Sequence, residues 1–237
     1  MIGLPVQASA QAAQLDHITS MVHVLMAVMF LGWAAYFGYV LIRFRHKRQP
    51  KADYHGVRGH WSTWTEAAVA IVEIVLLAAF SIPAWAARVS PAPVDALPVR
   101  VTAQQFSWMF HYAGPDGEFG RTDAALITPD NPAGLDRSSP HAADDVVSVN
   151  DMHLPVDRPV LVQLAARDVI HSFGVPAMRV KQDAIPGIAI PVWFTPTLRG
   201  AFDIACSQLC GLGHYRMRAV ITVTSADAFE SWLRAQR

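Results

Sequence analysis

The sequence predicts a membrane-anchored all-β protein, in which an N-terminal hairpin of two transmembrane helices precedes a β-sandwich or β-barrel domain. Two long apolar runs near the N-terminus and a series of short β-branched runs after residue 90 carry this prediction. The composition agrees, because 52% of the 237 residues are hydrophobic. The formal net charge is zero, which gives no reason to expect nucleic acid as a partner.

The first apolar run covers residues 22–42 and contains no Asp, Glu, Lys or Arg and a single histidine, His23. At helical rise it spans roughly 30 Å, the thickness of the hydrocarbon core of a bilayer. The second run, residues 67–87, contains Glu73. Buried helices of a soluble protein are the alternative, but they rarely hold apolar stretches of this length. The expected transmembrane helices span about residues 20–43 and 65–88.

A basic segment joins the two apolar runs, whereas the residues before the first run contain no lysine or arginine. By the positive-inside rule this segment is cytoplasmic, so that both chain ends lie on the opposite side of the lipid bilayer. Its basic residues are Arg43, Arg45, Lys47, Arg48, Lys51 and Arg58, against a single carboxylate, Asp53.

From Ser90 onward a Pro-rich linker leads into a polar, strand-rich region. No helical periods of 10 to 15 residues separate the strand-like runs, which favours a sandwich or barrel of about 140 residues over a βαβ fold. We therefore divide the chain into an anchor, 1–89, and an extracytoplasmic domain, 90–237, that ends in an amphipathic helix. The expected strands lie within residues 99–108, 159–166, 189–196, 200–207 and 217–225.

A long insertion, about residues 113–155, interrupts the expected strands and is rich in Gly, Pro and Asp. It is either a solvated loop or an acidic surface that attracts a basic partner. Its acidic residues are Asp116, Glu118, Asp123, Asp130, Asp136, Asp144, Asp145 and Asp151, against Arg121 and Arg137.

The segment Cys206–Met217, here called the Cys loop, contains the only two cysteines of the chain, followed by His214 and Met217. Thiolate, imidazole and thioether form a soft ligand set that suits copper. The cysteines could instead form a disulfide, or the four residues could share one face of a helix. Glycines within the loop argue against a regular helix, and a disulfide would leave the histidine and methionine unexplained, so the pattern favours a metal site.

Four motifs together resemble subunit II of cytochrome c oxidase. They are His171-Ser-Phe-Gly-Val-Pro176, Lys181-Gln-Asp-Ala-Ile-Pro-Gly187, the Cys loop and Gln105-Phe-Ser-Trp108. Their order matches that family, as does the helix hairpin before them, and the resemblance covers nearly the whole chain except the insertion.

The resemblance implies a cupredoxin-like β-barrel with two copper ions in a CuA centre. Both cysteines would bridge the two ions, two histidines would each supply a ring nitrogen, and a thioether and one main-chain carbonyl would complete the set. The implied ligands are His171, Cys206, Gln208 (through its carbonyl), Cys210, His214 and Met217.

The implied function is to accept electrons from cytochrome c, or from a complex that carries one, and to pass them to haem in the catalytic subunit I of an oxidase. That subunit, assembled with other oxidase subunits, would reduce oxygen to water and pump protons. The chain has no Cys-x-x-Cys-His motif, so the donor must be another protein. A bacterial inner membrane, with the C-terminal domain on the periplasmic side, is expected. The alternative is a membrane-anchored copper-binding or delivery protein without a respiratory role.

The chain departs from the family pattern at several positions. Gln208 stands where many members have a glutamate that also binds magnesium, and a neutral amide is a poorer ligand for that ion, which puts magnesium in question. Phe106 replaces the tryptophan that usually receives electrons, and Trp108 lies two residues on, so both are candidates for this role. Glu66 and Glu73 are candidates for a proton entrance, or for pairing with a neighbouring subunit.

Overall fold

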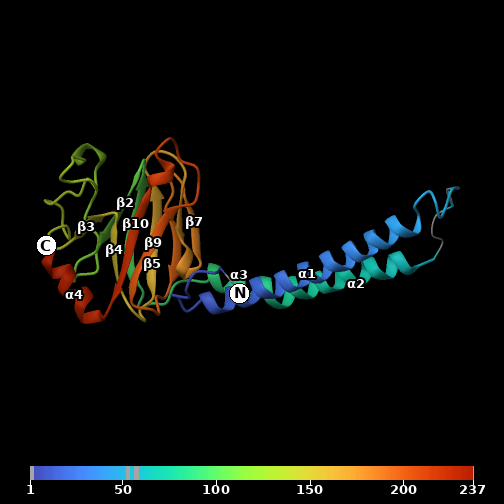
Figure 1. Cartoon of the computed structure of the whole chain (residues 1–237). Coiled ribbons are helices and arrows are strands. Elements are labelled where there is room, and N and C mark those ends of the chain that lie inside the picture. The colour runs from blue at the N-terminus through green and yellow to red at the C-terminus, as the bar shows by residue number, and fades with distance from the viewer. Residues whose placement is uncertain (1–2, 52–53, 56–58, 237) are drawn as a thin grey trace. The chain divides into compact units, whose positions relative to one another are not determined.

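The structure is a computed structural model that describes residues 3–51, 54–55 and 59–236. Asp53 and Arg58, which entered the orientation argument, lie outside these residues. The chain divides into two compact units, which are treated separately below (Figure 1). One is helical and covers Gln14–Ala87, and the other contains the remaining described residues.

The helical unit is a hairpin of two long helices. α1 covers Ala12–Arg43, and α2 covers Trp61–Leu76 and continues through a π-helical turn, Leu77–Ser81, into α3, Ile82–Val89. The π turn ends two residues before Pro83, whose missing N–H and bulky ring oppose a regular α-helical bond pattern. Both helical stretches are long and apolar enough to cross a membrane, with mean hydropathies of 1.9 and 2.3. α1 begins upstream of the predicted start near residue 20.

The second unit is a sandwich of two five-stranded sheets, with strand orders β3-β2-β1-β5-β8 and β4-β10-β9-β6-β7 (Figure 1). Most neighbouring strands are antiparallel, but β1 pairs with β5, and β10 with β4, in parallel. The strands are β1 Leu97–Gln104, β2 Ser107–Tyr112, β3 Val146–Val149, β4 Asp151–Pro155, β5 Val160–Ala166, β6 His171–Val175, β7 Val180–Ala184, β8 Ile190–Phe194, β9 Gly200–Cys206 and β10 Arg218–Thr224.

The predicted strand 99–108 is wrong as a single strand, because it is a hairpin of β1 and β2 that turns at Gln105 and Phe106. Alternate residues of β1 are buried, and this alternation ends where the chain turns. The turn places Trp108 in the core between the sheets, where its side chain is fully buried.

The predicted C-terminal helix is confirmed as α4, Ala226–Ala235. Its N-cap, Ser225, accepts a hydrogen bond from Ala228 N at 3.4 Å, which satisfies one of the free amides of the first turn. Phe229 and Leu233 are buried against the sandwich, so this helix closes one side of the core.

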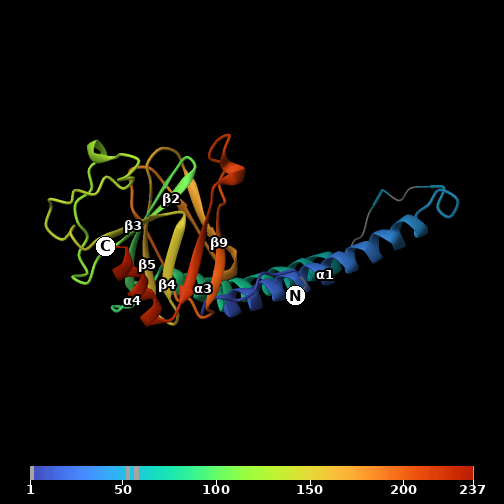
Figure 2. The same cartoon turned by 60° about the vertical axis from the view of Figure 1, so that its left-hand side comes forward.

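The insertion is shorter than predicted, because β3 and β4 occupy its last residues and the irregular segment ends at Asp145. Figure 2 shows this segment as an irregular lobe between β2 and β3. Asp145 is fully buried and accepts hydrogen bonds from His111 Nε2 at 2.6 Å and from Gly120 N at 2.8 Å, which fastens the lobe to β2. Two other carboxylates of the lobe are also paired, Asp116 with His141 and Asp136 with Arg121, and Asp151 in β4 pairs with His153.

Candidate metal centre

One end of the sandwich brings together segments that are distant in the sequence. His171 begins β6, Cys206 ends β9, and the Cys loop returns the chain to β10. β6 and β9 are neighbours in the sheet, with Phe173 opposite Cys206. Cys206 N donates to Met217 O at 3.1 Å, which closes the base of the loop.

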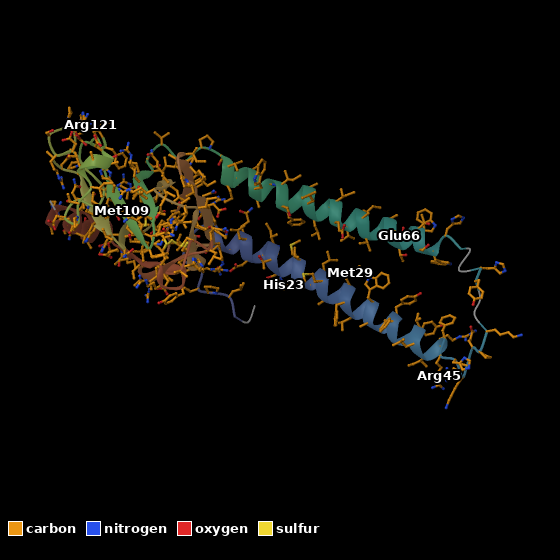
Figure 3. The ribbon with its side chains drawn as sticks, turned by 90° about the horizontal axis from the view of Figure 1, so that it is seen from above. His23, Met29, Arg45, Glu66, Met109 and Arg121 are labelled. Atoms are coloured by element: carbon orange, nitrogen blue, oxygen red, sulfur yellow. The ribbon has the colours of Figure 1, made fainter. Side chains whose placement is uncertain are left out.

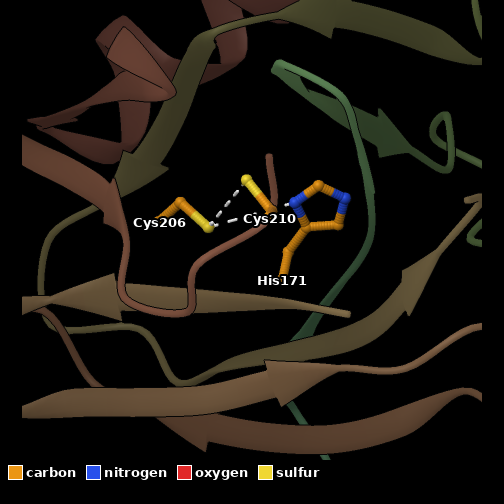
Figure 4. Close-up of side chains that lie close together, drawn as sticks. All are labelled: His171, Cys206 and Cys210. Carbon is orange, nitrogen blue, oxygen red and sulfur yellow. Dashed lines mark hydrogen bonds between the residues drawn. The ribbon is translucent and has the colours of Figure 1, made fainter. Parts of the chain in front are cut away.

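His171, Cys206 and Cys210 form a buried cluster whose ligand atoms all lie within 4.8 Å of one another (Figure 4). The two Sγ atoms are 3.8 Å apart, and His171 Nδ1 lies 3.9 Å from Cys206 Sγ. A disulfide requires an S–S distance of about 2.05 Å. Both thiols are therefore free, and the disulfide interpretation is wrong for this structure.

The remaining predicted ligands complete the cluster. His214 Nδ1 lies 3.5 Å from Cys210 Sγ, and Met217 Sδ lies 3.7 Å from the same sulfur. The main-chain oxygen of Gln208 lies 3.1 Å from Cys206 Sγ, while the side chain of Gln208 is exposed. All six predicted ligands thus lie close together at this end of the sandwich.

These distances fit a metal centre. Metal–sulfur bonds are about 2.3 Å and metal–imidazole bonds about 2.0–2.1 Å, so two ligands of one ion lie at most about 4.6 Å apart. The five distances given above range from 3.1 to 3.9 Å. The donor set combines soft sulfur with imidazole, which favours copper over a hard cation.

Asp168 orients His171. Its Oδ1 accepts a hydrogen bond from His171 Nε2 at 2.8 Å, which leaves Nδ1 free to face the thiols. Burial alone would raise the pKa of Asp168, but the hydrogen bonds from His171 and from two main-chain amides outweigh it and lower that pKa. The carboxylate therefore stays charged and holds the imidazole in one tautomer.

Burial, together with the neighbouring Cys206 thiol, raises the pKa of the Cys210 thiol to about 11. The metal-free thiol is therefore protonated at neutral pH. Because only the thiolate is a strong ligand, a metal that binds here must displace that proton.

The Cys loop is irregular, as its glycines predict, apart from a single 3-10 turn, His214–Arg216. A Cβ atom on Gly213 would lie 2.5 Å from the ring of Phe106, so this ring packs directly on the loop backbone. The Arg216 guanidinium lies 5.8 Å from the centre of the same ring. Because the loop is irregular, the alternative in which Cys206, Cys210, His214 and Met217 share one face of a helix is wrong.

The two electron-entry candidates differ in exposure: Phe106 is half-buried and packs on the Cys loop, whereas Trp108 is not accessible. Trp108 is fully buried and meets the rings of His171 and Phe173 edge-on, so a donor protein cannot contact it. Glu66 and Glu73 are exposed on α2, and Figure 3 shows Glu66 close to the loop end of that helix.

The sequence interpretation missed two residues that support the cluster, Asp168 and Gln105. The position of Asp168, three residues before His171, was an available signal, because carboxylates commonly orient ligand histidines. Gln105 belongs to the motif Gln105-Phe-Ser-Trp108, but its contact with the Cys loop could not be predicted, because it depends on the turn between β1 and β2.

Comparison with known proteins agrees with these observations. Residues 97–224 match the family model "Cytochrome C oxidase subunit II, periplasmic domain". The chain is 37% identical over 210 residues to the alternative cytochrome c oxidase subunit 2 of Bradyrhizobium diazoefficiens, covering 88% of this chain and 75% of that protein. It is 32% identical over 249 residues to cytochrome c oxidase subunit 2 of Cereibacter sphaeroides, covering 99% and 80%.

Among solved structures, the periplasmic domain of subunit II of cytochrome oxidase (CoxB) of Bradyrhizobium japonicum is similar, at 32% identity and a TM-score of 0.46. The match covers 62% of this chain and 96% of the length of that domain. The two-sheet topology and the family match together identify the β unit as a cupredoxin-like domain. In the sequence it follows two apolar helices, which confirms the predicted fold class.

Proposed function

We propose, on the basis that this chain belongs to the cytochrome c oxidase subunit II family, that it accepts electrons for a respiratory oxidase. The electrons would come from cytochrome c, or from a complex that carries one, and pass to haem in the catalytic subunit, where oxygen reduction is coupled to proton pumping. The strongest support for this proposal is that two thiols, two imidazoles, a thioether and a main-chain oxygen lie close together. The two apolar helices and the periplasmic-domain match support a membrane-anchored protein with a periplasmic C-terminal domain.

Two copper ions bound here would supply a centre that takes up and releases one electron at a time. Cys206 and Cys210 would hold both ions, and His171 and His214 would bind through Nδ1, the ring nitrogen that faces the thiols. The thioether of Met217 and the main-chain oxygen of Gln208 would complete the set. The thiolates would neutralise much of the metal charge inside the domain.

The surroundings of the cluster suit electron transfer. His171, Cys206, Cys210 and Met217 are 0 to 8% exposed, so water is largely kept from the donor atoms. The ligands lie on two paired strands and on a loop that is hydrogen-bonded at its base. A site held in this way changes geometry little between redox states, which favours fast transfer.

Purification of the full-length chain from its own membranes tests this function. We expect it to co-purify with a haem-bearing partner that has many membrane helices, and the complex to be reduced rapidly by ferrocytochrome c. A chain that is isolated without haem, and that passes copper to another protein, would instead support the delivery role.

Replacement of Gln208 by alanine is expected to leave the copper spectrum nearly unchanged, because its main-chain oxygen, and not its exposed side chain, faces Cys206. Copper content and the EPR spectrum of the purified variant check this prediction. Loss of either ion would show that the amide side chain is itself a ligand. Gln208→Glu provides the matched comparison, since only a carboxylate is expected to add affinity for magnesium.

The surface around the cluster suggests how a donor binds. Exposed apolar side chains lie on the Cys loop and on the segment before His171, close in sequence to the buried ligands, and are here called the apolar rim. Exposed apolar patches of this kind commonly mark protein interfaces. The insertion leaves the sandwich at Tyr112, at the opposite end of β2 from the turn that contacts the Cys loop. The rim consists of Val169, Ile170, Leu209, Leu212 and Tyr215.

We expect Leu212→Asp to raise the KM for the donor about tenfold, equivalent to about 1.4 kcal/mol, while the copper spectrum is unchanged. Leu212 is 98% exposed and presents apolar surface that the substitution would remove. Val94→Asp is the matched control, because Val94 is equally exposed but lies in the linker before β1. If Leu212→Asp leaves the KM for the donor unchanged, but the rate of reduction falls steeply as ionic strength rises, acidic residues of the insertion are favoured as the docking surface.

Glu66 remains the proposed proton entrance, with Glu73 as the alternative. The place of Glu66, close to the end of α2 that adjoins the basic loop (Figure 3), supports this choice. In the proposed orientation that end faces the cytoplasm, from which protons would enter.

A further inference from the structure

Gln105, in the turn between β1 and β2, contacts the Cys loop without being a predicted ligand. Its side-chain Nε2 donates a hydrogen bond to the main-chain oxygen of Cys210 at 2.6 Å. Cys210 itself is buried and carries one of the two thiols of the cluster. Gln105 therefore fastens the middle of the Cys loop to the other sheet of the sandwich.

The main chain of Gln105 reaches the opposite side of the same cluster. Its N–H donates to Asp168 Oδ2 at 2.7 Å, and Asp168 Oδ1 accepts from His171 Nε2 at 2.8 Å. One residue is thus linked to Cys210 directly and to His171 through one carboxylate. The relative positions of an imidazole and a thiol from different segments are held by this single turn.

The Cys loop is shaped to admit this contact. A Cβ atom on Gly211 would lie 2.6 Å from Gln105 Nε2, and Gly211 has a φ of +132°, which side chains other than that of glycine rarely adopt. Gly211 therefore leaves the space into which the amide of Gln105 fits.

We propose that Gln105 is a positioning residue, which fixes the Cys210 segment and His171 at the spacing that the copper pair requires. This inference rests on the proposed function, because it concerns the same site. Gln105 touches neither the thiols nor the imidazoles in a bonding role, and it acts through the Cys210 carbonyl and through Asp168. Residues in such supporting positions typically change metal affinity by about 10- to 100-fold when they are replaced.

The test uses the full-length chain in detergent, loaded with copper, and the variant Gln105→Met. Methionine has a similar length but no N–H donor, while the main-chain bond to Asp168 is retained. We expect copper loss to a chelator to accelerate about tenfold or more, with a shifted reduction potential and a changed copper hyperfine pattern. Gln105→Asn, which keeps the amide but is one methylene shorter, should fall between methionine and the unsubstituted chain.

Gln104→Met is the matched control, because Gln104 is the preceding residue and binds Arg167 rather than the Cys loop. If Gln105→Met matches this control in copper retention, potential and hyperfine pattern, the proposal is wrong.

A further measurement separates this inference from the proposed function. In the copper-free chain, Gln105→Met should expose the two thiols, which are 4 and 8% exposed, to faster alkylation. If the unsubstituted chain yields no two-copper spectrum, the proposed function fails, and the alkylation rates alone decide about Gln105. Equal alkylation rates in Gln105→Met and Gln104→Met would then overturn the inference.

Discussion

Cys206→Ser is expected to abolish the two-copper spectrum and to lower electron acceptance from the donor by more than about 100-fold. Loss of a supporting residue costs about 10- to 100-fold in metal affinity, so loss of a shared ligand should cost more. Serine keeps the size of the side chain but is a hard ligand that does not ionise at neutral pH. The remaining thiol, Cys210, would then have to hold copper without a second thiolate.

Copper content, EPR and rapid reduction by ferrocytochrome c measure this effect in the purified chain. The copper-free variant should melt within a few degrees of the copper-free parent, because the exchange changes one buried atom. A Cys206→Ser chain that still binds two copper ions per chain and accepts electrons at the parental rate would contradict the proposed centre.

Trp108→Ala is expected to lower the free energy of unfolding of the β unit by about 3–5 kcal/mol, the usual cost of truncating a buried large side chain. The ring is fully buried and packs edge-on against Phe173 at a centroid distance of 5.6 Å. Denaturant unfolding of the full-length chain, followed by the near-ultraviolet signal of the β unit, measures the loss.

Trp108→Phe should be much milder. Among the described residues Trp108 Nε1 has no hydrogen-bond partner, so removing this N–H leaves no acceptor unsatisfied. Since a donor cannot reach the buried ring, its KM should be unchanged. A tenfold rise in KM in Trp108→Phe, without loss of stability, would restore Trp108 as the residue that receives electrons.

The sequence predicted the fold where the pattern was strong. The runs that became β5, β8, β9 and β10 are rich in β-branched or aromatic residues, and the structure places each strand within its predicted run. The β1–β2 hairpin was merged into one strand, because Gln105 and Phe106 carry no turn signal such as Gly or Asn. β3 and β4 were not predicted, because they lie in a segment rich in Asp. They pair with β2 and β10, which are distant from them in the sequence.

The candidate site could also be predicted only in part. The spacing of Cys206, Cys210, His214 and Met217 indicated a soft metal site, because all four lie within one loop. His171 lies 35 residues from Cys206, and only the resemblance linked them before β6 and β9 were seen to pair. The supporting contacts of Gln105 depend on a turn conformation that the residue types do not specify.

Copper quantification with EPR on the purified full-length chain tests the central claim most directly. We predict two copper ions per chain and, in the mixed-valence state, one unpaired electron shared between both copper nuclei. A single copper per chain that gives no EPR signal would contradict the account and would point to a site that binds and delivers copper.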